Sequence, residues 1–565
     1  MRRRVRAQVA RPGRLETAWV CLLGLLLLGP ALAPGYVLSY DMVWVPDLAL
    51  TRDALGLGSG LPRAVPSDAV VAVLDELVPA VVLQKAVLLG AVVGGALGVV
   101  RLLPPDAVVP RLVAGAAYVW NPLVVERLVI GHWPLLLGYA VAPWVVLAAR
   151  RWQRSAAVPV ALWWLVPLGS LSASTGLVTG LLLVVLTARR EVRRWAQLGA
   201  LLLLANLPWL AAGLLHAGSA TSTASAAARF GLHAEGSVPA PLAALTLGGI
   251  WNAEVVPASR SGALGWLAAV VLVPLAAAGV GRLRAQLGER TWWGLVACWT
   301  VGWLGACLTW LAPGAVGAVA AVVPGGGVLR DGARLLVLCA PLLCLALGAG
   351  AGRLLERVPE PARVGAALGL LALPLALLPG VAWGAGGALR AVDYPADHAA
   401  ARAAVQQQRP EGDTVLLPFS SYRAPAWNGG RKVLDPTGRY LGVDVVQDDT
   451  LAVSGRLLPG EDPRAAQVRE VLAGGNPRSR AEDLAALGVG AVVLELGAGA
   501  SVAVAGEPWH RGTELVVQGL ADVAPVAVPR TWRAVMAVAW AGFVGAPLVA
   551  TGLALRRRAR PLAPG

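Results

Sequence analysis

The sequence predicts an all-α polytopic membrane protein with a small α/β domain inserted before its last helix. The first observation is composition: 57% of the 565 residues are hydrophobic and 14% are charged, with a mean hydropathy of +0.65. Soluble globular proteins carry about 25% charged residues, and disordered chains have low hydrophobicity, so neither class fits. The second is a series of apolar runs long enough to cross a bilayer. The third is one long polar segment, residues 385–533, between two such runs.

About twelve apolar runs, bounded by charged or turn residues, are candidate transmembrane helices. The third to sixth runs are short, and a re-entrant segment there would change the count. The runs lie near residues 17–38, 80–101, 107–121, 133–149, 156–172, 174–188, 196–215, 262–281, 292–311, 334–352, 364–384 and 534–555. This pattern predicts a membrane domain over residues 1–384 and a last helix with a basic tail over residues 534–565.

Arginines gather in alternate loops between these runs. They lie near residues 2–14, 101–111, 150–154, 189–194, 282–290, 353–363 and 556–560. The four short loops on the opposite side carry more acidic than basic residues. Because basic loops stay in the cytoplasm, we expect a protein of the cytoplasmic (inner) membrane with both termini inside. The formal net charge of +15 is then an orientation signal and not a surface for nucleic acid.

The polar segment 385–533 is expected to form a small extracytoplasmic α/β domain. Strand-like runs cover residues 414–418, 489–494 and 514–518, and helix-like runs cover 397–408 and 464–472. Turn residues separate these runs. A segment of this length is sufficient to bury a core of its own.

Several classes of site are disfavoured because their motifs are missing. The chain has no GxxxxGK[ST], HExxH or GxSxG, so we expect no nucleotide cofactor. The five histidines show no pair spaced by three or four residues, which disfavours a dedicated zinc site. The five cysteines lie in apolar runs without CxxC spacing, and we interpret them as core residues without disulfides.

The first outer loop, residues 39–79, holds the strongest catalytic candidates. Asp41 lies a few residues beyond the first predicted helix, at the membrane boundary, where a lipid-linked substrate presents its headgroup. A carboxylate there could act as a general base toward a hydroxyl, or bind a divalent cation such as Mg²⁺ or Mn²⁺ that neutralises a phosphate. Asp47 is the second candidate. The alternative is a solvated acidic loop.

Candidate substrate-binding residues lie in three later segments that we expect on the same face. The turn 120–133 carries Glu126, Arg127 and His132, which could line a headgroup pocket or belong to an interfacial turn. Glu235 lies in a later outer loop. Arg330 and Asp331 precede the tenth run, and an arginine on the outer side could bind phosphate or pair with Asp331.

An ordered set of motifs resembles a known family. The motifs are GYVLSYDMVWVPD, PRAVPSD, YVWNPLVVERLVIGHWPLLLGYAVAPW, GSLSASTG, GGIWN and VLRDGARL. They resemble actinobacterial multispan proteins related to the membrane core of cell-envelope arabinofuranosyltransferases, and more distantly YfhO-like proteins. Both groups resemble GT-C membrane glycosyltransferases. The resemblance implies a polyprenyl-phosphate sugar donor and an outward-facing site. It also implies an aspartate in the first outer loop that acts as a general base. The matching position here is Asp41, with Asp47 as the alternative.

Three functions remain open. The first is a GT-C-type glycosyltransferase that moves a sugar from a polyprenyl-phosphate carrier to an envelope glycan, glycolipid or protein on the outer face of the bilayer. The second is a transporter or flippase of lipid-linked precursors, which would show inverted repeats and ionisable residues at mid-membrane depth. The third is a non-catalytic envelope-assembly scaffold, in which Asp41 would be replaceable.

Overall fold

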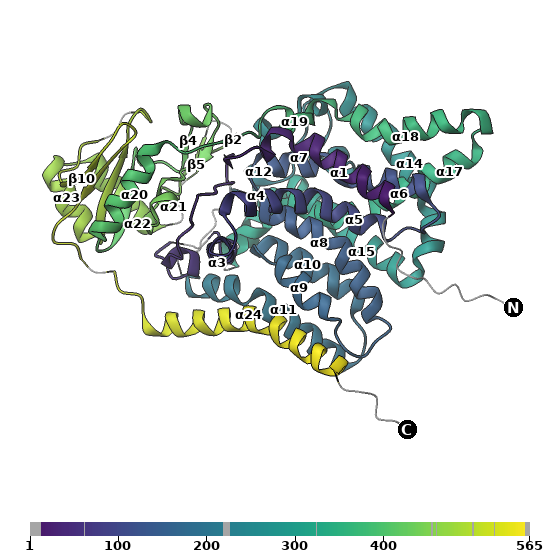
Figure 1. Cartoon of the computed structure of the whole chain (residues 1–565), viewed down its shortest axis with the longest axis horizontal. Coiled ribbons are helices and arrows are strands. Elements are labelled where there is room, and N and C mark those ends of the chain that lie inside the picture. The colour runs from purple at the N-terminus through teal and green to yellow at the C-terminus, as the bar shows by residue number, and fades with distance from the viewer. Residues whose placement is uncertain are drawn as a thin grey trace.

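The computed structural model describes residues 13–60, 63–218, 226–323, 325–453, 456–458, 460, 462–499, 502–524 and 526–559. A small α/β domain lies at one end of a large helical part (Figure 1). Helix α1 begins on the side of the helical part away from the α/β domain, and helix α24 runs along the lower edge from beside that domain (Figure 1). The outer parts of the predicted basic tails, at residues 2–11 and 560, lie outside the described residues.

Within the described ranges, nine helices are long and apolar enough to cross a membrane. A tenth span forms if η6 (Gly332–Leu338) and α17 (Ala340–Arg357), which are bent by 50°, cross together. The nine are α1 with its 3-10 extension (Arg14–Leu32), α4 to α5 (Ala80–Val100), α6 to α7 (Val108–Val129), α8 (Trp133–Trp152), α11 (Val192–Leu215), α14 (Ala263–Leu287), α15 (Glu289–Leu311), α18 with the turn before it (Glu360–Leu377) and α24 (Arg530–Ala559, apolar to Arg556). The predicted polytopic membrane fold is confirmed.

Two of the twelve predicted runs form helices that are too short to span. Run 156–172 contains α9 (Val160–Leu168), and run 174–188 corresponds to α10 (Ala173–Thr187). At 1.5 Å per residue, a nine-residue helix covers less than half of the roughly 30 Å hydrocarbon core. A count of ten, like the predicted twelve, is even and would place the two termini on the same side, whereas a count of nine would place them on opposite sides. The shorter connecting helices are α2 (Arg52–Leu55), α3 (Ser67–Asp75), α12 (Ala226–Phe230), α13 (Ala240–Leu245), α16 (Pro313–Val322) and α19 (Ala382–Gly386).

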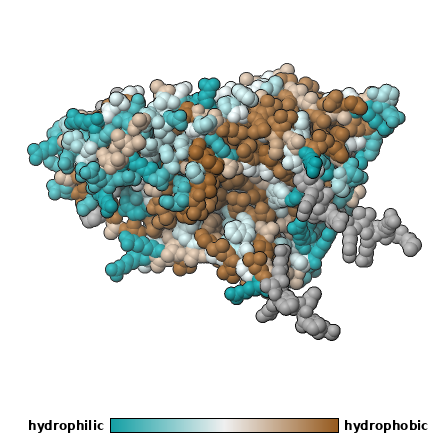
Figure 2. Space-filling model, viewed as in Figure 1, coloured by the Kyte–Doolittle hydropathy of each residue, from teal (hydrophilic) through white to brown (hydrophobic). Residues whose placement is uncertain are grey.

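Helices α6 and α8 form the centre of the helical part, and they are buried over most of their length. Peripheral helices instead expose large apolar side chains, such as Leu308 and Trp310 of α15 and Val544 of α24. The visible face of the helical part is accordingly hydrophobic over wide areas, whereas the α/β domain is mainly hydrophilic (Figure 2). A helix that is apolar on its outer face needs lipid as its solvent.

The α/β domain contains a five-stranded mixed sheet in the order β10-β11-β9-β3-β6. Strands β9 and β6 run parallel to β3, while β11 and β10 continue the sheet antiparallel. Valines and leucines alternate between its two faces, so α22 and α23 cover one face and α20 covers the other. The strands are β3 (Asp413–Leu417), β6 (Val445–Val446), β9 (Val489–Glu495), β10 (Glu507–Arg511) and β11 (Leu515–Gly519), and the helices are α20 (Ala396–Gln408), α21 (Thr437–Leu441), α22 (Pro463–Ala473) and α23 (Pro477–Ala486).

Two short sheets and a glutamine fix the first outer loop in place. Strand β1 (Tyr36–Val37) pairs with β2 (Ala391–Val392) at the entry to the α/β domain. The side chain of Gln84, from α4, accepts a hydrogen bond from the Val37 amide and donates one to the Val37 carbonyl. Strand β4 (Tyr422–Arg423) pairs with β5 (Val433–Leu434) and lies beside the same loop, while β7 (Leu451–Val453) and β8 (Arg456–Leu458) form a separate hairpin. The loop is therefore held between the helices and the α/β domain.

Candidate active site

The loop that carries Asp41 packs closely against the turn between α7 (Pro122–Val129) and α8. The Asp41 amide donates to the Ile130 carbonyl at 3.1 Å, and the Ser39 hydroxyl donates to the Val129 carbonyl at 2.6 Å. Gly131 permits this approach: its φ is +83°, and a Cβ there would lie 2.1 Å from the Met42 amide nitrogen. A larger residue would displace one of the two segments.

A chain of hydrogen bonds runs from Asp41 into the protein. Oδ2 of Asp41 lies 3.1 Å from Nε2 of His132, and Nδ1 of His132 lies 2.9 Å from Nη1 of Arg127. Arg127 in turn makes a bidentate pair with Asp331, at 2.8 and 3.0 Å. Asp41, His132 and Asp331, which come from three separate segments of the sequence, therefore form one network. Arg127 links His132 to Asp331.

The direction of each bond in this network follows from the chemistry of arginine. A guanidinium only donates hydrogen bonds, so Nδ1 of His132 accepts from Arg127 and its Nε2–H donates to Asp41. Burial lowers the pKa of His132, and the positive charges of Arg334 and Arg127 lower it further. The hydrogen bond to Asp41 raises this pKa but does not outweigh them. His132 is therefore a neutral hydrogen-bond donor that orients the carboxylate.

Asp41 is ionised in this setting. Desolvation would raise its pKa, but the hydrogen bonds from His132 and from the Tyr422 hydroxyl, together with the positive charge of Arg334, outweigh it and lower the pKa of Asp41. Its side chain is 40% exposed, whereas the side chain of Arg127 is fully buried. An exposed and oriented carboxylate on a buried polar support is suited to accept a proton from a substrate.

Two residues that the sequence analysis did not select complete this network. Tyr422, from β4, donates its hydroxyl to Oδ1 of Asp41 at 2.5 Å across 381 residues of sequence. Arg334 pairs with Asp331 at 2.9 Å, its side chain is 30% exposed, and its charge acts on both Asp41 and His132. Arg334 lies within the VLRDGARL motif and could have been selected with Arg330; no local pattern marks Tyr422.

Arg330 packs on an aromatic ring. Its guanidinium stacks on the ring of Phe230 at 4.6 Å. The recorded ion pairs of Asp331 are with Arg127 and Arg334. Burial would raise the pKa of Asp331, but the two arginines reverse this effect and hold that pKa well below its usual range.

Glu126 and Glu235 meet in a second, buried cluster. Their carboxyl groups are in contact, and each residue is about 1% exposed. Glu235 accepts from Arg260 at 2.7 Å and from the Gly249 amide at 2.6 Å. These contacts give both glutamates a role in joining α7 to the outer loops, and the substrate-binding role expected for them stays a prediction.

Asp47 faces the α/β domain. It forms an ion pair with Arg402 of α20, and its carboxylate is 58% exposed. No hydrogen bond or ion pair recorded among the described residues connects Asp47 to the Asp41 network. The catalytic role expected for Asp47 as an alternative to Asp41 stays a prediction that this geometry does not support.

The donor set around Asp41 does not suit a divalent cation held by protein ligands alone. Among the described residues, no group of three or more His, Cys, Asp or Glu side chains converges in a way that could hold a metal ion. Asp331 is neutralised by two arginines, and both ring nitrogens of His132 are engaged in hydrogen bonds, so Asp41 is the remaining donor of this network. Mg²⁺ and Mn²⁺ bind preferentially to several oxygen ligands, and no step is assigned to a metal here.

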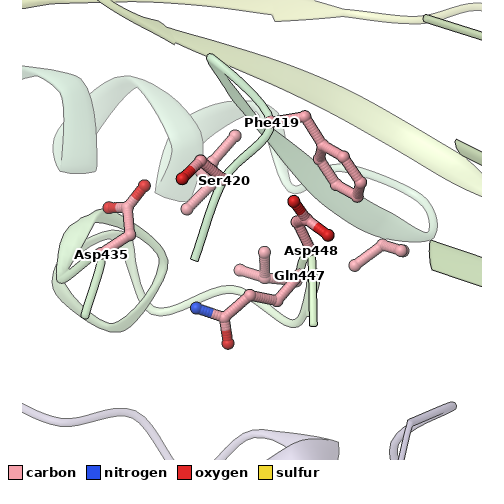
Figure 3. A pocket seen from close by; sticks show the side chains of 8 residues that line it. Phe419, Ser420, Asp435, Gln447 and Asp448 are labelled. Carbon is pink, nitrogen blue, oxygen red and sulfur yellow. The ribbon is translucent and has the colours of Figure 1, made fainter. Parts of the chain in front are cut away.

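A shallow depression lies at the carboxyl ends of β3 and β6 in the α/β domain. Phe419, Ser420, Asp435, Gln447 and Asp448 surround it (Figure 3). Such ends are frequent ligand sites in α/β sheets. Asp435 is paired with Arg423 here, and Asp448 is paired with Arg469. The acidic side chains are therefore already neutralised by the domain itself.

Comparison with known proteins identifies the fold. No protein-family model matches the chain, and no curated protein matches it. A cryo-EM structure of the arabinofuranosyltransferase AftD from Mycobacteria matches with a TM-score of 0.56 at 18% identity, over 92% of this chain and 40% of that one. A structure of an AftD mutant matches with a TM-score of 0.52 at 17% identity, over 91% of this chain and 42% of that one.

The chain thus spans about two-fifths of the length of these neighbours. At this level of identity, the match concerns the fold and not the activity. It agrees with the resemblance to GT-C membrane glycosyltransferases that the sequence motifs indicated. The chain has the GT-C membrane fold of the arabinofuranosyltransferase AftD, and its α/β domain packs against the first outer loop.

Proposed function

We propose that the chain is an integral membrane glycosyltransferase that moves a sugar from a polyprenyl-phosphate carrier to an acceptor of the cell envelope. The observation that carries this proposal is the oriented, ionised Asp41 at the end of the helical part nearest the α/β domain. The AftD-like fold supports the same reading. The site would face the outside of the cytoplasmic membrane, with residues 385–533 extracytoplasmic and both termini cytoplasmic.

Asp41 would act as the general base. An acceptor hydroxyl gives its proton to the Asp41 carboxylate, and its oxygen forms a bond to the anomeric carbon of the sugar. The bond between that carbon and the phosphate oxygen breaks, and its electron pair leaves with the polyprenyl phosphate. His132 and Arg127 keep the carboxylate oriented during this step, and they do not themselves exchange protons with substrate.

Arg334 would bind the phosphate of the donor. It is partly exposed, and its charge reaches Asp41 and His132, so a phosphate beside it would lie near the base. Negative charge grows on the phosphate as the glycosidic bond breaks, and a fixed guanidinium stabilises that charge. The sequence analysis favoured Arg330 for this role. Its guanidinium, however, stacks on the Phe230 ring.

The matched structures indicate which sugar donor and which acceptors to test first. The matched structures are arabinofuranosyltransferases, so the first donor to test is a polyprenyl-phosphoryl arabinofuranose. Acceptors to test are arabinose-containing glycans, followed by glycolipids and proteins of the envelope. A divalent cation would arrive bound to the substrate phosphate, because Asp41 is the one carboxylate of the described Asp41 network that is not paired with an arginine.

Complementation of a deletion strain tests this function. Asp41→Asn and Asp41→Ala, at matched membrane levels, should each lose one defined envelope linkage, whereas Asp47→Asn should behave like the wild type because Asp47 faces Arg402. Removal of a general base typically costs 10²- to 10⁴-fold in rate. Full activity of both Asp41 variants would contradict the proposed site and favour a scaffold, while accumulation of an unused precursor on the inner face would favour a flippase.

A further inference from the structure

The α/β domain reaches the proposed site through the β4–β5 hairpin. The Tyr40 amide donates to the Lys432 carbonyl at 2.7 Å, and the Leu434 amide donates to the Tyr40 carbonyl at 2.8 Å. The side chain of Asn428 donates to the Leu38 carbonyl at 3.3 Å. Because these bonds use the backbone of the loop, they fix the loop in register with the hairpin.

The hairpin itself is anchored in the sheet of the α/β domain. Arg423, next to Tyr422, is 5% exposed and pairs with Glu495 at 2.9 Å and with Asp435 at 3.0 Å. It also donates to the Ser420 carbonyl at 3.0 Å. A buried arginine with this many partners holds the adjoining residue in one position.

Tyr422 donates a hydrogen bond to one carboxylate oxygen of Asp41, and His132 donates one to the other. The two donors lie 2.5 and 3.1 Å from Oδ1 and Oδ2, respectively. Each carboxylate oxygen can accept two hydrogen bonds, and Asp41 is 40% exposed. The carboxylate is thus fixed in orientation by two donors and still has capacity to accept a substrate hydroxyl.

We infer that Tyr422 is a positioning residue of the proposed site, through which the α/β domain orients Asp41 for proton transfer. This inference rests on the proposed function in one respect: it takes Asp41 to be the general base. The site is then built jointly by the first outer loop, the α7–α8 turn and the α/β domain. A separate helical part would lack one of the two donors to the carboxylate.

The inference predicts a specific change in the titration of Asp41. The charged or titratable groups that act on Asp41 are His132 from the α7–α8 turn, Tyr422 from β4, Arg334 from η6 and Arg439 from α21. The Tyr422 hydroxyl is one of the groups that lower the pKa of Asp41. Tyr422→Phe removes only this hydroxyl, so it should raise that pKa.

Tyr40→Phe provides a matched control. The Tyr40 and Tyr422 rings are neighbours, with centroids 6.3 Å apart, and both belong to the contact between loop and hairpin. The Tyr40 hydroxyl, however, donates to Glu254 and not to Asp41. A general loosening of this contact would affect both variants alike, whereas loss of a hydrogen bond to Asp41 would affect Tyr422→Phe alone.

The test measures protonation of Asp41 directly in the purified full chain. A water-soluble carbodiimide reacts with protonated carboxyls, and mass spectrometry follows labelling of Asp41 between pH 2 and pH 7. In Tyr422→Phe the midpoint should move up by about 0.5 to 1 pH unit, the shift expected from one hydrogen bond, while Tyr40→Phe should match the wild type. Equal midpoints in all three proteins, or equal shifts in both variants, would overturn the inference.

The same proteins, assayed with a synthetic short-chain polyprenyl-phosphoryl arabinofuranose, separate this inference from the proposed function. If transfer occurs, the acid limb of its pH profile should move with the labelling midpoint in Tyr422→Phe. A shifted limb without a shifted labelling midpoint would overturn the role assigned to Tyr422. Absence of transfer by the wild type, with the labelling shift present, would contradict the proposed function and leave the positioning of Asp41 by Tyr422 established.

Discussion

At the scale of single residues, the candidate site depends on which arginine lies beside the base. Arg330 and Arg334 are four residues apart and equally basic, but they have different surroundings. Arg334 pairs with Asp331 and acts on Asp41, whereas Arg330 stacks on Phe230. Because Coulomb interaction weakens with distance and with solvent screening, we expect Arg334 to act more strongly than Arg330 on a phosphate held near Asp41.

Substitution of these two arginines therefore separates their roles. Arg334→Gln should raise the apparent KM for the polyprenyl-phosphate donor by about 10- to 100-fold, because a charge-assisted hydrogen bond contributes roughly 1.5–3 kcal/mol. The fold should persist, since Asp331 keeps its bidentate pair with Arg127. Arg330→Gln is the control and should stay within a few-fold of the wild type. The reverse ranking, measured in a donor titration, would move the phosphate to Arg330.

At the scale of elements, an aromatic cluster joins the α/β domain to the first outer loop. His398 of α20 is 1% exposed and contacts Tyr394, Trp427 and Tyr440. The Tyr394 hydroxyl donates to the Trp44 carbonyl at 2.9 Å, which links this cluster to the loop. Burial lowers the pKa of His398 from 6.5 to about 4. The neutral imidazole is therefore the form that fits the cluster.

The buried histidine makes this region sensitive to acid. The unfolded state binds a proton near pH 6.5 and the folded state only near pH 4, so stability is full above pH 6.5 and falls as the pH decreases toward 4. Between pH 6.5 and 5 the loss should be about 2 kcal/mol. Hydrogen exchange of α20 amides, corrected for intrinsic rates, measures this loss. His398→Leu should lack the acid-dependent increase, and an unchanged slope would show that another group is responsible.

At the scale of the whole molecule, the membrane part combines long spans with a pair of short helices. Helices α9 and α10 are joined at residues 169–172, where the Ser172 side chain caps α10. If α9 and α10 each cross the membrane, or if they form a re-entrant hairpin that does not cross it, the chain leaves the membrane on the side where it entered. The predicted sidedness therefore does not depend on the difference between ten and twelve spans.

Labelling of introduced cysteines tests this topology. Ser155, between α8 and α9, should face the cytoplasm, and Gln407, on α20, should face outward; both are exposed. A membrane-impermeant maleimide should label Gln407→Cys in intact cells and Ser155→Cys only after permeabilisation, because basic loops remain inside. The chain with only its native cysteines is the background. Labelling of Ser155→Cys in intact cells would reverse the orientation.

The elements of this protein were predictable because their signals are local. Apolar runs gave the long spans, and short strand-like runs bounded by turn residues gave β3, β9 and β11 near their observed bounds. Run 156–172 is longer than α9 because apolar residues flank that helix, whereas run 174–188 is only as long as α10, so its length alone does not support a span. Asp41, Arg127, His132 and Asp331 were selected because charged groups at a membrane boundary are costly unless they pair or function.

The sequence by itself determined the class of protein, its polar outer domain and a list of candidate residues. Only the tertiary structure decided which candidates meet. It joined Asp41 to His132 across 91 residues and Arg127 to Asp331 across 204, and it added Tyr422 across 381. It also directed Asp47 to Arg402. Hydropathy and periodicity depend on near neighbours in the chain, whereas these contacts depend on how the helices and the α/β domain pack around the first outer loop.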